Sequence, residues 1–312
     1  MVADRLLLLD TPSLYFRAFY GVPESVTAPD GTPVNAVRGL LDFIARLVRD
    51  RQPTHLVAAM DADWRPAWRV EVLPSYKLHR VAADGGDQTP DSLATQVPVI
   101  EQVLDAVGLC RMGVAGFEAD DVIGTLATTA RGAVDVVTGD RDLFQLVRDD
   151  KPVRVVYTAK GVGQAQPWDE AAVTAKYGIP GRSYAEFATL RGDPSDGLPG
   201  VAGVGDKTAA ALVTRFGTVD RILEAARSGD DDGFPSGARG KVLAAVDYLQ
   251  KAPVVVRVAC DIDLPTHDDR IPATPRHPEE LLALSDRWGL ESALNRLLAA
   301  LATTGAAQRT PE

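Results

Sequence analysis

The sequence predicts an α/β fold built around a mostly parallel sheet, and three observations lead to that class. Short apolar runs recur along the first two-thirds of the chain, as is typical of strands buried on both faces. Each run ends in an acidic residue or in a turn that leads to one. Amphipathic segments of helical length lie between the runs, and strands that alternate with helices indicate a parallel sheet.

The elements of this first part follow from the spacing of apolar residues. Within residues 34–49, for example, Val37, Leu40, Leu41 and Ile44 form one stripe of a helix. The predicted order is strand 6–9, helix 34–49, strand 56–60, helix 90–107, helix 117–130 and strand 134–137.

From about residue 182 onward the pattern changes to helices joined by Gly-rich turns. Residues 198–205 predict a tight loop that opens a helix over 206–215, and residues 228–233 predict an exposed loop. We therefore expect three parts: a core over 1–181, a helical region over 182–302 and a flexible tail over 303–312.

The composition excludes several classes of protein. With 312 residues, of which 46% are hydrophobic, the chain is neither collagen-like, disordered nor stapled by disulfides. Cys110 and Cys260 stand far apart, so reduced thiols in a cytoplasm are expected. No apolar stretch approaches the ~20 residues of a membrane span, and no membrane association is expected. The net charge of −10 argues against an obvious nucleic-acid binder.

Acidic residues gather where predicted strands end. Asp10, Asp61 and Asp140 each follow such a strand, and catalytic groups of open α/β sheets collect at that edge. Nine carboxylates are candidates for one pocket: Asp10, Asp61, Glu118, Asp120, Asp121, Asp140, Asp142, Asp193 and Asp196. Without cations they would repel one another strongly. Two or more Mg²⁺ or Mn²⁺ ions, which favour oxygen ligands, would remove this repulsion and support phosphodiester cleavage.

Each carboxylate also has an ordinary structural interpretation. An Asp that follows a strand often caps a helix or forms a turn. Glu118 and Asp121 suit the positive first turn of a helix, and Asp142 suits the cap of a short helix. Spacing alone does not show that these groups converge.

Residues 73–89 fit neither a helix nor a strand. The segment begins Leu-Pro-Ser-Tyr-Lys-Leu-His-Arg and passes into a Gly- and Asp-rich stretch that lacks core residues. A long polar insertion in a compact domain is usually a functional loop or lid.

Six motifs occur along the chain in a fixed order. They are Asp10, Met60-Asp61, LPSYKLHR at 73–80, FEADDVIG at 117–124, TGDRDL at 138–143 and GDPSDGLPGVAGVGDKTA at 192–209. Together they resemble the bacterial 5′ nucleases, which include flap endonucleases and the 5′→3′ exonuclease domain of DNA polymerase I. The resemblance covers about residues 4–300. It implies a PIN-like nuclease core, a helical arch at about 73–92, a helix-three-turn-helix that binds duplex DNA, and a stand-alone enzyme, since no polymerase domain follows.

The resemblance also implies roles for the carboxylates. A first metal centre would be served by Asp10, Asp61, Glu118, Asp120 and Asp121. A more distal centre would be served by Asp140, Asp142, Asp193 and Asp196.

Basic and aromatic residues receive roles in the same way. Lys77 and Arg80 match a Tyr-Lys-x-x-Arg element at the base of the arch and would grip the scissile phosphate. Tyr76 would stack on a displaced base, or else lie half-buried on a solvated helix face. Arg17 would contact a phosphate, or else be a basic residue at a helix end.

The Gly-rich loop would anchor duplex DNA. Gly200, Gly203 and Gly205 would let backbone amides approach phosphates, with Lys207 near the positive end of the next helix. In the family this loop holds K⁺ through main-chain oxygens, which makes K⁺ a possible second cofactor. An ordinary helix hairpin is the alternative.

The chain departs from the family pattern at two positions and in one linker. Pro194 and Gly197 replace the usual Ser and Asn, and the linker 81–92 is longer and richer in Gly and Asp. Pro194 removes a backbone amide, and Gly197 removes a side-chain amide from the region of the second metal centre. The linker is expected to affect flap threading and exonuclease preference rather than phosphodiester cleavage.

The function implied is metal-dependent 5′→3′ exonuclease and flap endonuclease activity during replication and repair. The expected partner is DNA with 5′ flaps, nicks or RNA-primed ends, and the expected state is a nucleoid-associated, cytoplasmic monomer. Two alternatives come from other classes: a non-catalytic junction-binding protein, and a PIN-type ribonuclease acting on single-stranded RNA.

Overall fold

A six-stranded sheet forms the centre of the computed structural model, which describes residues 4–83, 85–229 and 232–307. The strands are β1 (Arg5–Asp10), β2 (His55–Ala59), β3 (Cys110–Met112), β4 (Ala133–Thr138), β5 (Val153–Tyr157) and β6 (Gln166–Trp168). Their order across the sheet is β3-β2-β1-β4-β5-β6. All neighbours are parallel except β6, which runs antiparallel to β5. The predicted α/β class with a mostly parallel sheet is confirmed.

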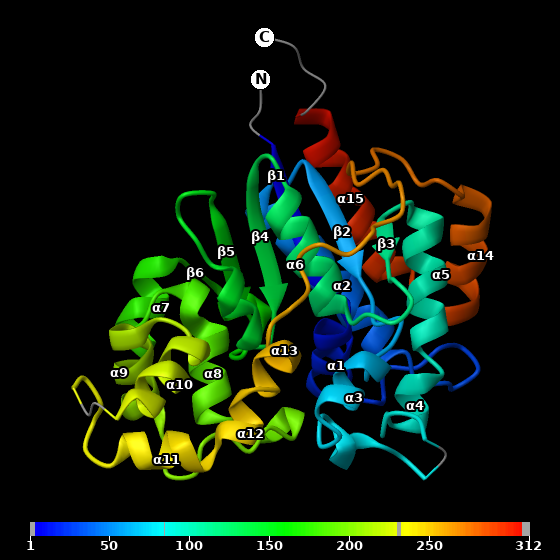
Figure 1. Cartoon of the computed structure of the whole chain (residues 1–312). Coiled ribbons are helices and arrows are strands. Elements are labelled where there is room, and N and C mark those ends of the chain that lie inside the picture. The colour runs from blue at the N-terminus through cyan, green and yellow to red at the C-terminus, as the bar shows by residue number, and fades with distance from the viewer. Residues whose placement is uncertain (1–3, 84, 230–231, 308–312) are drawn as a thin grey trace.

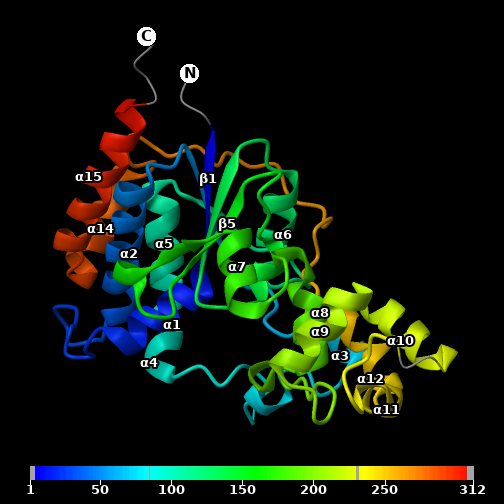
Figure 2. The ribbon, with the colours of Figure 1, turned by 90° about the vertical axis from the view of Figure 1, so that its left-hand side faces the viewer.

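The apolar runs form strands because both faces of the sheet are covered. Along β1, Leu6 and Leu8 lie in one hydrophobic cluster, whereas Leu7 and Leu9 lie in another on the opposite face. Helix α6 (Ala119–Thr129) covers the first face, and α2 (Asn35–Arg51) and α5 (Val97–Val107) cover the second. Figures 1 and 2 show these three layers.

Short helices surround the carboxyl ends of the strands. They are α1 (Thr11–Gly21), α3 (Ala67–Val72) and α4 (Asp91–Ala94). The single helix predicted over 90–107 is in fact two, α4 and α5, because Pro98 occupies the first turn of α5. The break is packed rather than loose: the buried side chain of Gln96 accepts a hydrogen bond from the backbone of Ala36 at 2.8 Å and donates one to Asn35 at 3.0 Å.

A group of helices projects from one side of the sheet at this end (Figure 2). Its members are α7 (Glu170–Tyr177), α8 (Tyr184–Arg191), α9 (Asp206–Phe216), α10 (Val219–Ser228), α11 (Ala238–Ala244), α12 (Val246–Leu249) and α13 (Ala252–Val256). The helix predicted over 206–215 is confirmed as α9. The loop predicted over 228–233 is exposed where it is described, and residues 230–231 lie outside the described part.

The chain then returns to the core. Helices α14 (Pro278–Trp288) and α15 (Glu291–Ala307) place Leu281, Leu294 and Leu297 in the same hydrophobic cluster as Leu41 of α2. The prediction that residues 182–302 share one helical region therefore misses this return. The predicted tail is also too long, because α15 continues through residue 307; residues 308–312 lie outside the described part.

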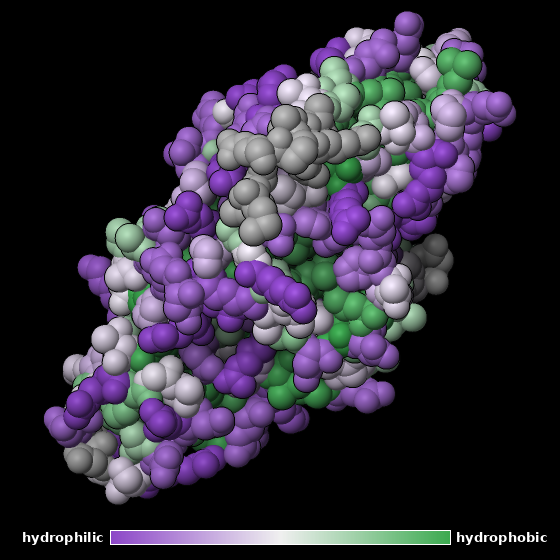
Figure 3. All heavy atoms as spheres, turned by 90° about the horizontal axis from the view of Figure 1, so that it is seen from above, coloured by the Kyte–Doolittle hydropathy of each residue, from purple (hydrophilic) through white to green (hydrophobic). Residues whose placement is uncertain are grey.

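The two ends of the sheet differ in character. β1 begins and α15 ends near the amino ends of the strands, at the top of Figure 1. Seen from there, the face is largely hydrophilic, with hydrophobic residues in smaller areas between (Figure 3). No helix of the described residues is long and apolar enough to cross a membrane. The predicted acidic residues lie at the opposite end, where β2, β1 and β4 end side by side.

The return of α15 predicts a measurable contribution to stability. Replacing the fully buried Leu297 with Ala removes packing against α2 and should lower the free energy of unfolding by about 2–5 kcal/mol. Urea denaturation measures this change. The matched control is Leu282→Ala, since Leu282 is 64% exposed and should cost within about 0.5 kcal/mol. Equal costs for the two variants would show that α15 does not belong to the core.

Candidate active site

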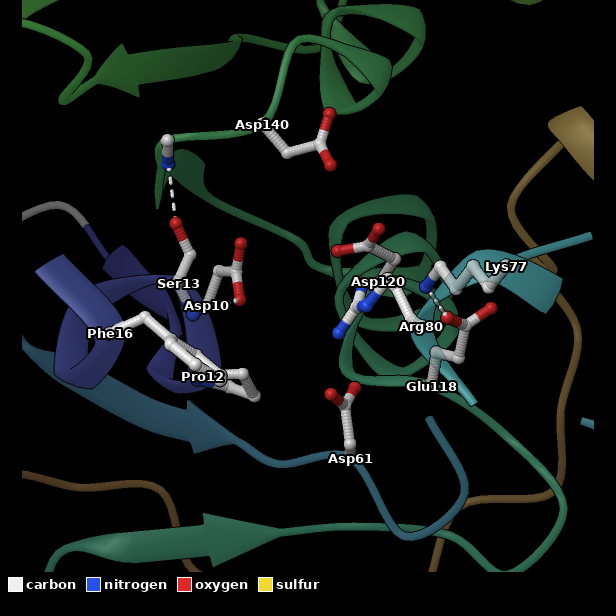
Figure 4. Close-up of a pocket in the computed structure, with 11 residues that line it drawn as sticks. Asp10, Pro12, Ser13, Phe16, Asp61, Lys77, Arg80, Glu118, Asp120 and Asp140 are labelled. Atoms are coloured by element: carbon white, nitrogen blue, oxygen red, sulfur yellow. Dashed lines mark hydrogen bonds and ion pairs between the residues drawn. The ribbon is translucent and has the colours of Figure 1, made fainter. Parts of the chain in front are cut away.

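A pocket opens at the carboxyl ends of β2, β1 and β4, and carboxylates surround it (Figure 4). Its lining includes Asp10, Asp61, Glu118, Asp120 and Asp140. These side chains come from three strand ends and from the start of α6. In Figure 4, Asp10, Asp61, Asp120 and Asp140 point toward the space between them. The prediction that separated acidic elements meet at this edge is thus confirmed for five of the nine candidates.

Backbone and hydroxyl donors fix these carboxylates in place. Asp10 ends β1 and caps α1, accepting hydrogen bonds from the Ser13 amide at 3.2 Å and the Thr138 hydroxyl at 2.5 Å. Asp61 accepts from the Ala119 amide at 2.8 Å. Asp140 accepts from the amide of Asp142 at 2.8 Å. The capping interpretation and the pocket interpretation therefore both hold for Asp10, because its cap bonds aim the carboxylate into the pocket.

The pocket carries an excess of negative charge. Burial, and then the neighbouring carboxylates Asp61 and Asp140, raise the pKa of Asp10 to about 7 despite its hydrogen bond from Thr138. Burial followed by the charges of Asp10 and Asp140 raises the pKa of Asp120 well above its ordinary value. A cation between these groups would relieve both effects.

The donor chemistry fits hard divalent ions. The pocket offers carboxylate oxygens and neither thiolate nor imidazole among its lining residues, the donor set that Mg²⁺ and Mn²⁺ prefer. Among the described residues, however, no three acidic, His or Cys side chains stand close enough to enclose an ion. The carboxylates stand apart around the pocket, an arrangement suited to ions that keep several of their own waters.

Glu118 differs from the other lining carboxylates because donors already surround it. It accepts hydrogen bonds from Arg69 at 2.5 Å and from the Tyr76 hydroxyl at 2.7 Å, and it pairs with Lys77. Burial still raises its pKa, although Lys77 and Arg69 oppose that shift. Lys77 contacts one oxygen of Glu118, and Arg69 and Tyr76 share the other.

Asp121 is not among the residues that line the pocket, and its predicted place in the first metal centre stays a prediction. Its side chain is fully buried and pairs with Arg69 through two hydrogen bonds, at 2.6 and 2.8 Å. It also accepts from the amides of Glu118 and Ala259, at 3.2 and 2.8 Å. All of its accepting capacity is used within the protein. These contacts give Asp121 a structural use at the start of α6.

Arg69 is the residue that sequence reasoning missed. It lies on α3, is 2% exposed, and joins Glu118 and Asp121 while donating to the Val255 carbonyl at 3.1 Å. Its guanidinium also lies 4.3 Å from the ring centre of Trp68. The sequence did offer one signal for a buried ion pair: Arg69 stands between Trp68 and Val70, and an arginine that is buried among apolar residues needs a carboxylate partner.

Tyr76 is buried, and its predicted stacking on a displaced base does not fit this position. Its ring is 4% exposed and its hydroxyl donates to Glu118. Burial raises the pKa of Tyr76 well above its ordinary value, so the hydroxyl keeps its proton. Tyr76 thus supports Glu118.

Lys77 and Arg80 both line the pocket, as the resemblance implied. Lys77 has the left-handed backbone conformation with φ of 49°, uncommon outside glycine, and its amide donates to the Asp196 carbonyl at 2.9 Å. Arg80 pairs with Asp87 at 2.7 Å, and its guanidinium lies 5.3 Å from the ring centre of Trp64.

The segment expected to form a helical arch is a compact loop. Between residues 73 and 90 the described part holds one helical element, a 3₁₀ turn at Leu78–Arg80. Beyond it the chain folds back on itself, with the Gln88 amide donating to the Arg80 carbonyl at 2.9 Å. A stretch rich in Gly and Asp gains too little from helix formation, and the Arg80–Asp87 pair closes the loop instead.

The remaining carboxylates form a second group beside the pocket. Asp142 is buried, and one of its oxygens has no partner. Burial, followed by the charges of Asp140, Asp196 and Asp193, raises its pKa well above the ordinary value. Burial likewise raises the pKa of Asp196 to about 6, although Lys77 opposes it. Asp193 is less available, because it accepts from Ser195 and lies 3.4 Å from Arg191.

Both departures from the family motif fit their positions. Pro194 occupies the first position of the 3₁₀ turn Pro194–Asp196, where no amide hydrogen is needed. Gly197 has φ of 71°, and a Cβ there would lie 2.2 Å from the Ser75 carbonyl oxygen. Glycine therefore lets this turn dock against the segment that carries Lys77.

Residues 198–205, between α8 and α9, form the tight Gly-rich turn that the sequence predicted, and α9 begins directly after it. A Cβ at Gly200, whose φ is 66°, would lie 2.5 Å from the backbone of Arg191. Gly203, Gly205 and Lys207 are exposed, and Gly205 caps α9. The Gly203 carbonyl accepts a hydrogen bond from the Lys241 ammonium at 2.8 Å.

Arg17 lies just outside this pocket. Its guanidinium donates to the Ala159 carbonyl at 3.4 Å, while its Nε atom is buried without a partner.

Comparison with known proteins gives a consistent result. The model of the "5′-3′ exonuclease, N-terminal resolvase-like domain" matches residues 5–178, and that of the "5′-3′ exonuclease, C-terminal SAM fold" matches residues 179–279. The chain is 58% identical to a 5′-3′ exonuclease of Streptomyces coelicolor, covering 95% of this chain and 99% of the relative. It is 49% identical to a 5′-3′ exonuclease of Mycobacterium tuberculosis, covering 96% and 98%. The fold is similar to that of the T5 D15 protein co-crystallised with metal ions, with a TM-score of 0.63 and 16% identity over 96% of this chain and 99% of that one.

The buried position of Arg69 predicts a large loss of stability when it is removed. Arg69→Leu leaves Glu118 and Asp121 buried without their partner and should lower the free energy of unfolding by about 3–5 kcal/mol in urea denaturation. The control is Arg111→Leu, which breaks a half-exposed pair with Asp105 and should cost about 0–1 kcal/mol. A cost for Arg69→Leu within the range of the control would contradict this role.

The contact of Gly197 with Ser75 predicts that even one methyl group disturbs the site. Gly197→Ala should cost about 1–3 kcal/mol more than Gly31→Ala, because both positions have positive φ but only Gly197 lacks space. The comparison requires urea denaturation of both variants and their rates of DNA cleavage. We expect only Gly197→Ala to slow cleavage, since the turn also supports Lys77. Indistinguishable variants would rule out the docking of this turn as a requirement.

Proposed function

Because this chain belongs to the 5′-3′ exonuclease family, we propose that it is a nuclease that cleaves DNA phosphodiesters at junctions between single and double strands, as both a 5′→3′ exonuclease and a flap endonuclease. One observation carries the proposal. Carboxylates from three strand ends and one helix start surround a pocket that Lys77 and Arg80 also line. This combination suits a phosphate that needs both cations and an activated water.

Asp10, Asp61, Asp120 and Asp140 would hold Mg²⁺ or Mn²⁺, with Asp142 and Asp196 serving a neighbouring centre. Such ions, when bound, lower the pKa of a coordinated water and neutralise charge on the phosphate. Glu118 would contribute through its hold on Lys77, and Asp193 through the turn that it caps.

Lys77 and Arg80 would bind the scissile phosphate by exchanging partners. Each now pairs with a carboxylate, Lys77 with Glu118 and Arg80 with Asp87. A phosphate oxygen is an equivalent acceptor, and the guanidinium of Arg80 can offer it two parallel hydrogen bonds. Both side chains already face the pocket, so the exchange needs rotation of side chains rather than refolding.

The Gly-rich turn would anchor the duplex independently of sequence. The exposed amides at Gly203 and Gly205 and the ammonium of Lys207 suit contacts with phosphates, which position DNA without reading bases. K⁺ would bind the main-chain oxygens of this turn other than that of Gly203, which already accepts from Lys241. The biological role would be removal of flaps and RNA-primed ends, by a monomer, during replication and repair.

Cleavage of a labelled 5′ flap tests the proposal. Asp120→Asn and Asp140→Asn should each slow cleavage about 100-fold or more with Mg²⁺ or Mn²⁺, since metal binding contributes several kcal/mol to such reactions. Asp105→Asn, on the exposed surface of α5, is the control and should leave the rate unchanged.

Each remaining outcome has a defined meaning. Unchanged rates in both pocket variants would refute the metal assignment. Tight flap binding without cleavage under either ion would indicate a non-catalytic junction-binding protein. Faster turnover of single-stranded RNA than of flap DNA would indicate a ribonuclease.

A further inference from the structure

A groove runs from the active-site pocket along the outer side of α1. We call it the Tyr20 groove; its volume is about 860 Å³, within the range of cavities that bind ligands. Ser13 and Phe16 line both the pocket and the groove, so the two lie next to each other. The opposite wall is the turn between β5 and β6, which contains Lys160.

The chemistry of this groove differs from that of the pocket. Among the described residues, its lining holds the cations Arg17 and Lys160 and no carboxylate. In a chain of net charge −10, a groove lined by cations beside an acidic pocket indicates that the groove binds an anionic ligand.

Aromatic rings add a second kind of contact. Phe16, Tyr20 and Phe43 line the groove, and Tyr20 is 74% exposed. The ring of Tyr20 is also supported, because it lies edge-on to the buried Phe19 with ring centres 5.1 Å apart. An exposed, supported ring beside cations is the arrangement on which unpaired bases stack while their phosphates meet positive charge.

The β5–β6 turn contributes residues 159–163 to the lining of the groove. Gly161 has φ of 96°, and a Cβ there would meet no atom within 4 Å. The neighbouring Gly163 is fixed from behind, since its carbonyl accepts a hydrogen bond from Arg46 of α2 at 3.2 Å. Lys160 and Ala159 are exposed at the rim.

We propose that the Tyr20 groove binds the unpaired 5′ strand next to the scissile phosphate, with a base stacked on Tyr20 and backbone phosphates contacting Lys160 and Arg17. This inference rests on the proposed function, because the strand enters from the nuclease pocket. Among the described residues the buried Nε of Arg17 has no acceptor, so this guanidinium keeps a hydrogen-bond donor unused beside the groove.

Binding to matched DNA substrates tests the inference. Fluorescence anisotropy is measured in an Asp120→Asn background, which is expected to slow cleavage, with a nicked duplex lacking unpaired nucleotides and with 5′ flaps of increasing length. Tyr20→Ala should weaken binding of the flaps about tenfold, because one stacked base is lost, and should leave the nicked duplex unchanged. Tyr20→Phe keeps the ring and should bind like the parent.

The salt dependence of DNA binding tests the proposed contact between Lys160 and a phosphate. Lys160→Ala should weaken flap binding and reduce the slope of log affinity against log salt by about 0.7, the value for one phosphate contact on a single strand. Lys176→Ala and Leu282→Ala, which alter exposed residues of α7 and α14, are the controls and should change neither quantity.

Several results would overturn the inference. Unchanged flap binding in Tyr20→Ala and Lys160→Ala, with wild-type cleavage intact, refutes the groove while leaving the nuclease function in place. An equal loss on flaps and nicked duplex assigns the groove to duplex DNA and also refutes it.

If the wild type cleaves no flap, the proposed function fails independently of the groove. Binding of a labelled oligothymidylate then decides the matter for the groove alone. Weaker binding in Tyr20→Ala supports single-strand recognition, and unchanged binding refutes it.

Discussion

The buried guanidinium of Arg69 joins parts of the chain that are distant in sequence, and the geometry of the pocket depends on it. It pairs with Glu118 and Asp121 at the start of α6 and donates to the Val255 carbonyl in α13. Charges in such a low-dielectric site are stable only when each is matched, so these elements take one relative position. The network thereby connects the projecting helices to the edge of the sheet where Asp10 and Asp61 lie.

A division of labour among the acidic residues follows. Asp121 and Glu118 pair with cations of the protein itself, whereas Asp10, Asp120 and Asp140 line the pocket, where burial and the neighbouring carboxylates raise the pKa values of Asp10 and Asp120. This division resolves the apparent conflict between an acidic chain and a DNA substrate. Negative charge is concentrated where cations are required, while the Tyr20 groove and the turn at Gly203 and Gly205 offer positive or neutral donors.

Sequence alone was sufficient where local pattern decides the outcome. Buried apolar runs predicted β1, β2 and β4, and parallel pairing of these strands necessarily brought Asp10, Asp61 and Asp140 together. Sequence alone was insufficient where the position of a side chain or helix depends on a partner that is distant along the chain. The inward turn of Asp121 depends on Arg69, the burial of Tyr76 depends on Glu118, and the folding of α15 onto the core depends on an open face of α2. The periodicity of apolar residues does not reveal which distant residues will be partners. The ion pair between Arg80 and Asp87 could not be predicted for the same reason.

The position of Lys77, one of the two residues proposed to bind phosphate, depends on the neighbouring turn Pro194–Asp196. The turn at Pro194–Asp196 reaches the segment of Lys77 only because Gly197 has no side chain, and the Asp196 carbonyl then accepts the amide of Lys77 in its left-handed conformation. The backbone of Lys77 is thus fixed while its ammonium remains free to exchange acceptors. Because Lys77 and Arg80 begin with carboxylate partners, a phosphate bound as proposed would exchange acceptors rather than desolvate free cations. The carboxylates of Glu118 and Asp87 would lose these partners in the exchange, so an acceptor that reaches both cations at once would be favoured over one that reaches a single cation.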